Sequence, residues 1–275
     1  MSFKAHPGVR ARFGTVDEGA FGRNVSRFQL FYLKQPHGGK LHLSVDGAPH
    51  ATLDTEGPET KAAVFDVEVA DGPHMMEVLT AERFTRTFGV VLERDVPGVV
   101  LDAIGIQGAR IRFLDKQDDA HWAEQLQLRR PNLLVYQFGA TESGDGFAYS
   151  MEDYHRTMKA VLEQGQRAVP NAGCLIVGAM DRARKQGDVL VTVPIIPHIV
   201  KEQRAVAEAV GCAFFDTYEA MGGRGSMAIW VRRGLGQADM THPSGWGAQV
   251  LGKWLYGAMI EGYNAYLKRE PARTP

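Results

Sequence analysis

An aspartate and a histidine stand three positions apart, at Asp239 and His242, within the stretch QADMTHPSGWGAQVLG. Histidine serves as a general base near neutral pH once its tautomer and ring orientation are fixed, and a carboxylate bonded to one ring nitrogen fixes both. Pro243 favours an extended backbone at His242, which lets the two side chains converge on a tight turn. The pair is therefore a candidate for half of a hydrolytic triad. Helix capping by Asp239 or Ser244 is the plainer interpretation of the same residues.

Two other polar stretches, IGIQGAR and FGATESGDG, follow apolar runs that are typical of buried strands. Ligands of parallel α/β sheets bind at the carboxyl ends of strands, so both stretches are candidates for a binding site. Gln107 and Glu142 are the polar residues that could line it. Each stretch also has a simple structural interpretation, since a glycine after a strand is usually a turn and a Thr-Glu-Ser cluster is usually a loop.

The chain that must position these residues has two halves with different periodicity. Up to residue 96, apolar residues alternate with polar ones in short runs separated by turns, as in SRFQLFYLKQ, KLHLSVDG and TRTFGVVLER. Such a pattern predicts antiparallel strands. Phe28, Leu30 and Tyr32 would share one face, and Leu41, Leu43 and Val45 another. We therefore expect residues 1–96 to form a two-sheet β-sandwich or jelly roll.

From residue 97 onward, short apolar strands alternate with helices, which predicts a parallel sheet covered by helices on both faces. The predicted strands are VPGVVLDAIG, NLLVYQFG, CLIVGAM and CAFFD, and the predicted helices cover 114–131, 150–169, 199–211 and the C-terminal region. Asp118 or Asp119 would begin the first of these helices and Pro131 would end it. We place this second domain at 97–275.

Composition excludes several classes of partner. The 275 residues are 44% hydrophobic, which is enough for a folded core, and 31 Lys and Arg against 32 Asp and Glu give a formal net charge of −1. No basic stripe is present for nucleic acid or an anionic membrane, so a small molecule or a glycan is the expected partner. Neither a membrane-spanning run nor a secretory signal is found in the chain, and its compartment stays open.

The two cysteines, Cys174 and Cys212, each begin an apolar run, CLIVGAM and CAFFD respectively. A thiol in such a position is usually a small buried hydrophobe. We expect two inert core thiols rather than a disulfide or a nucleophile.

Taken together and in this order, the three polar stretches resemble the sequence blocks of the SGNH (GDSL-type) hydrolases. The similarity is to the polysaccharide and peptidoglycan O-acetyl esterases, which carry an inserted carbohydrate-binding-like β-sandwich, and it covers Pro97 to Leu267 and, more loosely, the N-terminal half. It implies a flavodoxin-like parallel sheet and serine-type hydrolysis of O-acetyl groups on a glycan, with no cofactor and no metal. An exported or envelope location is implied by the resemblance alone.

The resemblance also implies roles for individual residues. IGIQGAR matches the block whose glycine lends a backbone N–H to the oxyanion hole, which is Gly108 here. PNLLVYQFGATES matches the block usually written Gly-Thr-Asn-Glu, with Thr141 in place of the oxyanion asparagine. ADMTHPSGW matches the last block, so Asp239 becomes the orienting acid and His242 the general base. A glycine suits the first role because a residue without Cβ lets a carbonyl oxygen approach the backbone closely.

The chain departs from the family pattern at the nucleophile, because no strand ends in Gly-Asp-Ser. Only Ser143, two residues beyond Thr141, would be near the site as a relocated nucleophile. We expect instead that the chain begins inside the inserted sandwich, with the first strand and the nucleophile upstream of Met1. A sheet without its first strand exposes an unpaired edge, which favours aggregation or self-association.

A second departure is Thr141, whose hydroxyl reaches less far than an asparagine amide. Loss of an oxyanion donor costs about 2.7–4 kcal/mol of transition-state stabilisation, so we expect a weak or inactive esterase. The alternative is a non-catalytic carbohydrate-binding or scaffold remnant of such an enzyme. Metal-dependent hydrolysis ranks third, since Asp239 and His242 supply two ligands at most.

Overall fold

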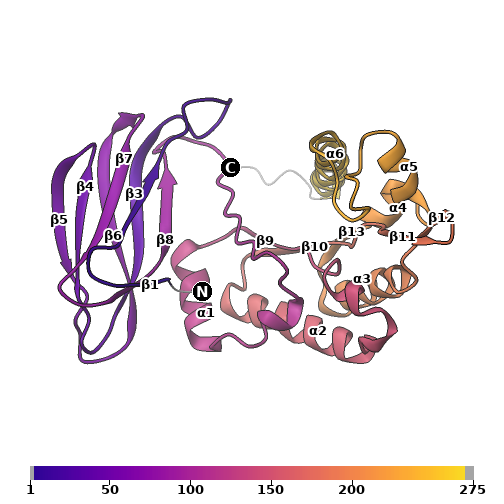
Figure 1. Ribbon diagram of the computed structural model, residues 1–275, viewed down its shortest axis with the longest axis horizontal. Coiled ribbons are helices and arrows are strands. Elements are labelled where there is room, and N and C mark those ends of the chain that lie inside the picture. Colours follow the sequence, from indigo (N-terminus) through magenta and orange to yellow (C-terminus); the bar gives the residue numbers. More distant parts are fainter. Residues whose placement is uncertain (1–2, 270–275) are drawn as a thin grey trace. The chain divides into compact units, whose positions relative to one another are not determined.

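The computed structural model describes residues 3–269, and the chain divides into two compact units, residues 1–104 and 105–275 (Figure 1). The first unit is built from strands, and the second combines helices with short strands.

Two four-stranded antiparallel sheets make up the first unit. The strand order of one sheet is β1 (Phe3–Ala5), β8 (Thr85–Glu93), β3 (Val25–Lys34) and β6 (Lys61–Gly72), and that of the other is β2 (Arg10–Gly14), β7 (Met75–Ala81), β4 (Lys40–Val45) and β5 (Ala48–Asp54). Phe28 and Leu30 of β3 share one buried cluster with Leu41 and Leu43 of β4. The period-two pattern therefore places alternate side chains of both sheets in a common core, as expected for a half-buried strand. The predicted antiparallel strands are confirmed.

A histidine and an aspartate join two turns of this unit. The His74 Nδ1 lies 2.7 Å from Asp46 Oδ2 and the His74 Nε2 lies 2.8 Å from the carbonyl oxygen of Ala70. Both neighbours are acceptors, so both bonds form only when the ring is protonated. The hydrogen bond with Asp46 accordingly raises the pKa of His74 above its ordinary value of 6.5, and the same bond lowers the pKa of Asp46.

This pair predicts a pH-dependent stability of the strand ends around it. Because the folded pKa of His74 is raised, its contribution is fully present below about pH 6.5, the unfolded value, and is lost as the pH rises through the folded pKa. We expect the hydrogen-exchange protection of the Met75 and Asp46 amides, which bond across this junction, to fall over that range. In His74→Gln the protection factors should lose this pH dependence. An unchanged pH profile in the variant would contradict the assignment.

The second unit is organised around three parallel strands in the order β13 (Ala213–Phe215), β10 (Gly173–Val177) and β9 (Leu133–Tyr136). Helices α2 (Met151–Ala168) and α3 (Ile196–Val210) pack against each other, and their apolar side chains join those of the sheet in one buried cluster. Helix α1 (Asp119–Arg129) packs on α2. Strands that alternate with helices thus form a parallel sheet, as the sequence predicts.

The ends of these helices follow the capping rules. The Asp118 side chain accepts a hydrogen bond from the backbone N–H of His121 at the start of α1, and Ser150 does the same for Asp153 at the start of α2. Gly211, with a left-handed φ of 73°, ends α3. The helix boundaries predicted from the sequence are confirmed within a few residues for α1 and α2.

Several elements of the second unit were not expected from the sequence. They are two short 3-10 helices, η1 (Ile111–Phe113) and η2 (Glu142–Ala148), a hairpin of β11 (Ala183–Gln186) with β12 (Val189–Thr192), and helices α4 (Thr217–Met221) and α5 (Ser226–Arg232). The last helix, α6 (Gly245–Arg269), is largely exposed, and its only buried residue is Gly247. Over residues 3–269, no helix combines the length and the apolar character needed to cross a bilayer.

The predicted strand VPGVVLDAIG is wrong. Residues 94–110 form neither helix nor strand, and Val99, Leu101 and Ile104 are 98%, 85% and 84% exposed. A run of apolar residues forms a strand only where a neighbouring strand pairs with its backbone N–H and C=O groups. This run has no such partner among residues 3–269.

The prediction of two inert core thiols is also wrong, because Cys174 and Cys212 form a disulfide with a Cα–Cα distance of 4.8 Å. Leu175 pairs with Ala213 in the register of the parallel strands β10 and β13, so each cysteine directly precedes one member of this pair. Apolar neighbours predicted burial in the sequence, but the register that makes the thiols adjacent was not visible there.

Candidate active site

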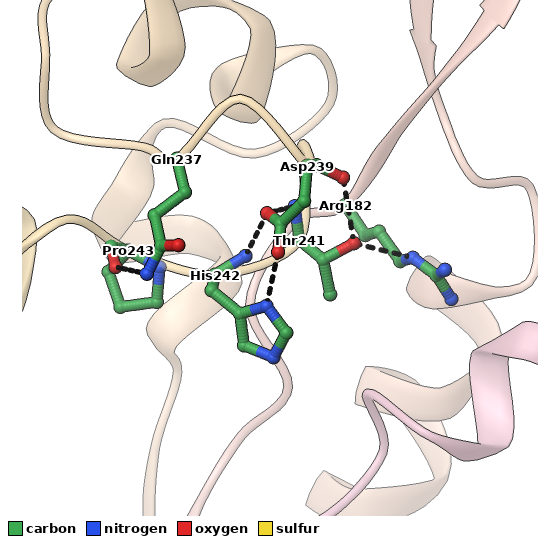
Figure 2. Close-up of polar contacts among 6 residues, drawn as sticks. All are labelled: Arg182, Gln237, Asp239, Thr241, His242 and Pro243. Atoms are coloured by element: carbon green, nitrogen blue, oxygen red, sulfur yellow. Dashed lines mark hydrogen bonds and ion pairs between the residues drawn. The ribbon is translucent and has the colours of Figure 1, made fainter. Parts of the chain in front are cut away.

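Asp239 and His242 contact each other on one turn (Figure 2). The His242 Nδ1 lies 2.5 Å from Asp239 Oδ2, and Asp239 Oδ1 accepts hydrogen bonds from the backbone N–H groups of Thr241 and His242 at 2.9 and 3.0 Å. The ring bond first, and the two backbone bonds next, lower the pKa of Asp239 to about 2. The side chain is therefore an ionised acceptor at neutral pH.

This arrangement sets the tautomer of the neutral imidazole. A carboxylate at Nδ1 requires the proton on that nitrogen, which leaves the lone pair on Nε2. Nε2 has no hydrogen-bond partner among the described residues 3–269, and 63% of the His242 side chain is exposed. The geometry is that of a general base with its reactive nitrogen open to a ligand.

The turn itself is held by a set of local hydrogen bonds. The Gln237 backbone N–H donates to the carbonyl of His242, and its side-chain amide donates to the carbonyl of Pro243. Met240 lies between them with a left-handed φ of 59°, a conformation that non-glycine residues adopt only where the surroundings impose it. Helix capping falls to Ser244, whose Oγ accepts from the Gly247 N–H, so Asp239 is free to orient the ring.

Two contacts fix this turn beside the carboxyl end of strand β10. The Ala183 backbone N–H donates to the carbonyl of Met240 at 3.0 Å. The Arg182 Nε donates to the Thr241 hydroxyl at 3.0 Å (Figure 2). Both residues belong to the segment that follows β10. The Asp–His turn is thus attached to the chain that leaves the carboxyl end of β10, and ligands of parallel α/β proteins bind at that end of the strands.

A buried glutamate ties two other predicted stretches together. Glu142 is fully buried, and its carboxyl group accepts a hydrogen bond from the Ile111 N–H at 2.8 Å and another from the Gly139 N–H at 2.9 Å. The expectation that Glu142 lines the pocket is therefore wrong. Its side chain points inward and links the loop after β9 to the segment that follows Gly108.

Gly108 and Thr141 lie on the two segments that Glu142 connects. Gly108 is exposed in a turn closed by the Ala109 N–H and the Ile106 carbonyl, and its φ of 72° is left-handed. Thr141 is half-buried, and its hydroxyl has no hydrogen-bond partner within residues 3–269. Neither residue contacts His242 directly. Their connection to the Asp–His turn passes through Ser143, Arg182 and Thr241, and their oxyanion role stays a prediction.

Ser143 is held in place by its neighbours. Its Oγ donates to the Ala140 carbonyl at 2.7 Å and accepts from Arg182 Nη1 at 3.0 Å, and the residue is 2% exposed. Ser143 therefore links the β9 loop to Arg182, and both bonds engage its hydroxyl. The other serines of residues 105–269 also have structural contacts, since Ser150 and Ser244 cap helices and Ser226 bonds the buried Asp181. Within that range no serine hydroxyl contacts His242.

Sequence reasoning missed a buried glutamine behind the site. Gln203 of α3 is fully buried, and its amide donates to the Phe138 carbonyl and the Tyr154 hydroxyl and accepts from the Ala179 N–H. It thereby joins the carboxyl ends of β9 and β10. The available signal was a glutamine in the apolar stripe of α3, between Ile199 and Val206.

No group of three or more histidine, cysteine, aspartate or glutamate side chains within residues 3–269 could hold a metal ion.

Comparison with known structures finds proteins with a similar fold. The chain aligns with a peptidoglycan O-acetylesterase at a TM-score of 0.67 and 18% sequence identity, over 95% of this chain and 78% of that chain. The two proteins share a fold. An acetyl xylan esterase matches with a TM-score of 0.44 and 15% identity over 56% of this chain and 78% of that one. A GDSL-like lipase from Bacteroides thetaiotaomicron matches with a TM-score of 0.43 and 17% identity over 56% of this chain and 73% of that one. No family model and no curated protein sequence matches the chain.

Proposed function

We propose that this protein is an ester hydrolase of the SGNH class that removes O-acetyl groups from a glycan, with His242 as general base and Asp239 as the residue that orients it. The bond between the His242 Nδ1 and the Asp239 carboxylate carries the proposal, because it leaves Nε2 as an exposed base beside the carboxyl end of the sheet. The fold shared with a peptidoglycan O-acetylesterase supports it. In this proposal the first unit is a carbohydrate-binding-like β-sandwich.

The reaction needs a nucleophile, and no serine of residues 105–269 contacts His242. We therefore assign that role, in this chain alone, to water. The His242 Nε2 takes a proton from water as the oxygen attacks the acetyl carbonyl. The tetrahedral intermediate then collapses, the bond to the sugar oxygen breaks, and that oxygen recovers the proton from the imidazolium. The products are acetate and a free sugar hydroxyl.

The developing oxyanion would be stabilised by the backbone N–H of Gly108 and the hydroxyl of Thr141. Both donors are without partners in the described part of the chain, and both lie on the segments that Glu142 connects. Preorganised donors of this kind supply much of the rate enhancement in acyl transfer. With a threonine for an amide and water for a serine, we expect slow turnover.

Hydrolysis of p-nitrophenyl acetate and of acetylated xylan tests the proposal. We expect His242→Ala to lower the rate by about 100-fold or to the buffer background, because general-base catalysis contributes about 10²–10⁴-fold. Asp239→Asn should also reduce the rate, through the wrong tautomer. His155→Ala is the matched control, because it removes a histidine of α2 that bonds Glu202 and lies outside the site, and it should keep the wild-type rate.

A fluorophosphonate probe reports on the nucleophile separately. Labelling of a single serine that disappears in His242→Ala would contradict the role of water while supporting hydrolysis. Equal rates for the wild type and His242→Ala would remove the basis of the proposed activity.

The second candidate is a non-catalytic glycan-binding or scaffold protein. One observation favours it, namely that every serine of residues 105–269 has a structural role. It predicts binding of acetylated glycan by folded protein with neither hydrolysis nor probe labelling.

An exported location accords with the fold match and with the disulfide, since disulfides persist in oxidising compartments. We also propose self-association through the sheet edge at β9, where Leu133 and Val135 are exposed and no neighbouring strand pairs within residues 3–269.

A further inference from the structure

A cavity of about 360 Å³ lies beside the Asp–His turn. Its lining includes Ser143 and Phe147 of the β9 loop, Arg182 and Arg184 after β10, and Pro194. The volume falls in the range of small-molecule sites. Arg182 connects the cavity to the proposed site directly, because its Nε donates to Thr241, the residue before His242.

The cavity carries uncompensated positive charge. Within residues 3–269, the guanidinium group of Arg182 donates only to the neutral hydroxyls of Ser143 and Thr241, and neither Arg182 nor Arg184 forms an ion pair with a carboxylate. Other arginines of the same unit are paired, as Arg110 is with Asp145 and Arg204 with Asp216. Guanidinium groups offer planar N–H donors that match a carboxylate, and only two of the donors of Arg182 are used within residues 3–269.

An aromatic ring completes the lining. Phe147 is 65% exposed, although it packs edge to face on His198 at 5.3 Å between ring centroids. A largely exposed aromatic ring offers an apolar surface to a ligand ring. A flat apolar ring beside two guanidinium groups fits a ligand that combines a sugar ring with a negative charge.

We propose that this cavity binds the carboxylate of an acidic sugar and thereby selects O-acylated acidic glycans over neutral ones. The proposal rests on the proposed hydrolase function for the identity of the site, and it names the substrate class. Arg184, exposed at the rim, contributes charge, and Arg182 contacts the carboxylate while it holds the Asp–His turn. Two chemical sources carry such a group, a hexuronic acid and a sugar with a carboxyalkyl ether.

Binding measured without turnover tests this inference. Oligogalacturonate and N-acetylmuramic acid are titrated into the full chain beside neutral galacto-oligosaccharide and N-acetylglucosamine, with chemical shifts or calorimetry as the readout. We expect the acidic sugars to bind more tightly than their neutral counterparts, with an affinity that falls as salt is added. The tighter of the two acidic ligands identifies the source of the carboxylate.

The variant Arg184→Gln should weaken binding of the acidic sugars by about three- to fivefold, as expected for a rim charge, and leave neutral sugars unaffected. Lys185→Gln is the matched control, since it removes the same charge from the adjacent position of β11 and does not line the cavity. Equal losses in the two variants, or equal affinity for acidic and neutral sugars, would overturn the inference. His242→Ala should bind acidic sugars normally, so a failure of hydrolysis is distinguishable from a failure of recognition.

Discussion

Replacing Glu142 with alanine is expected to lower the free energy of unfolding of the second unit by about 3–5 kcal/mol. The change leaves two buried backbone donors, the N–H groups of Ile111 and Gly139, without an acceptor. Each unsatisfied donor costs about 1–3 kcal/mol, in addition to the cost of the cavity left by the side chain. All four tryptophans of the chain lie between residues 122 and 254, so tryptophan fluorescence during urea unfolding follows this unit alone.

Two controls separate this effect from a general loss of charge. Glu142→Gln keeps one carbonyl oxygen as an acceptor and should show a smaller loss than the alanine variant. Glu208→Ala removes an exposed carboxylate from α3 and should change stability by no more than about 0.5 kcal/mol. If Glu142→Ala were as stable as Glu208→Ala, Glu142 would not be the link between the two segments of the site.

Removing the disulfide is expected to cost about 4 kcal/mol. The bond closes a loop with a sequence separation of 38, and the entropy that such a loop removes from the unfolded chain gives a stabilisation of this size. The double variant Cys174→Ala, Cys212→Ala should therefore unfold at markedly lower urea concentration, measured by the same tryptophan signal.

Reduction provides the internal comparison for this prediction. Dithiothreitol should shift the unfolding midpoint of the wild type towards that of the double variant and leave the variant unchanged. A wild-type midpoint that is the same with and without reductant, in protein whose thiols are shown to be free after treatment, would contradict a stabilising role.

The sequence predicted the elements whose signals are local. Asp118 and Ser150 mark helix starts through their own side chains, Gly211 marks a helix end, and alternation along β3 and β4 defines the buried face. The Asp239–His242 contact was also predictable, because three residues on one turn suffice to form it.

What the sequence did not predict depends on contacts between distant segments. Arg182 bonds both Ser143, about 40 residues earlier in the sequence, and Thr241, about 60 residues later. The sequence around Arg182 contains no signal that predicts either partner. Glu142 and Gln203 are polar residues whose burial is stabilised by backbone groups far along the chain. The strand predicted around Leu101 was wrong for the opposite reason. Its composition suits a strand, but a strand forms only where a neighbouring strand pairs with it.

The open side of β9 has a consequence for handling the purified protein. Its four residues, Leu133 to Tyr136, include no charged residue and no proline. Natural proteins use such residues on edge strands to prevent pairing with other molecules. In concentrated solution, aggregates would then grow as further molecules pair with this edge strand by strand. Turbidity and loss of protein on filtration would therefore limit the usable protein concentration before unfolding does.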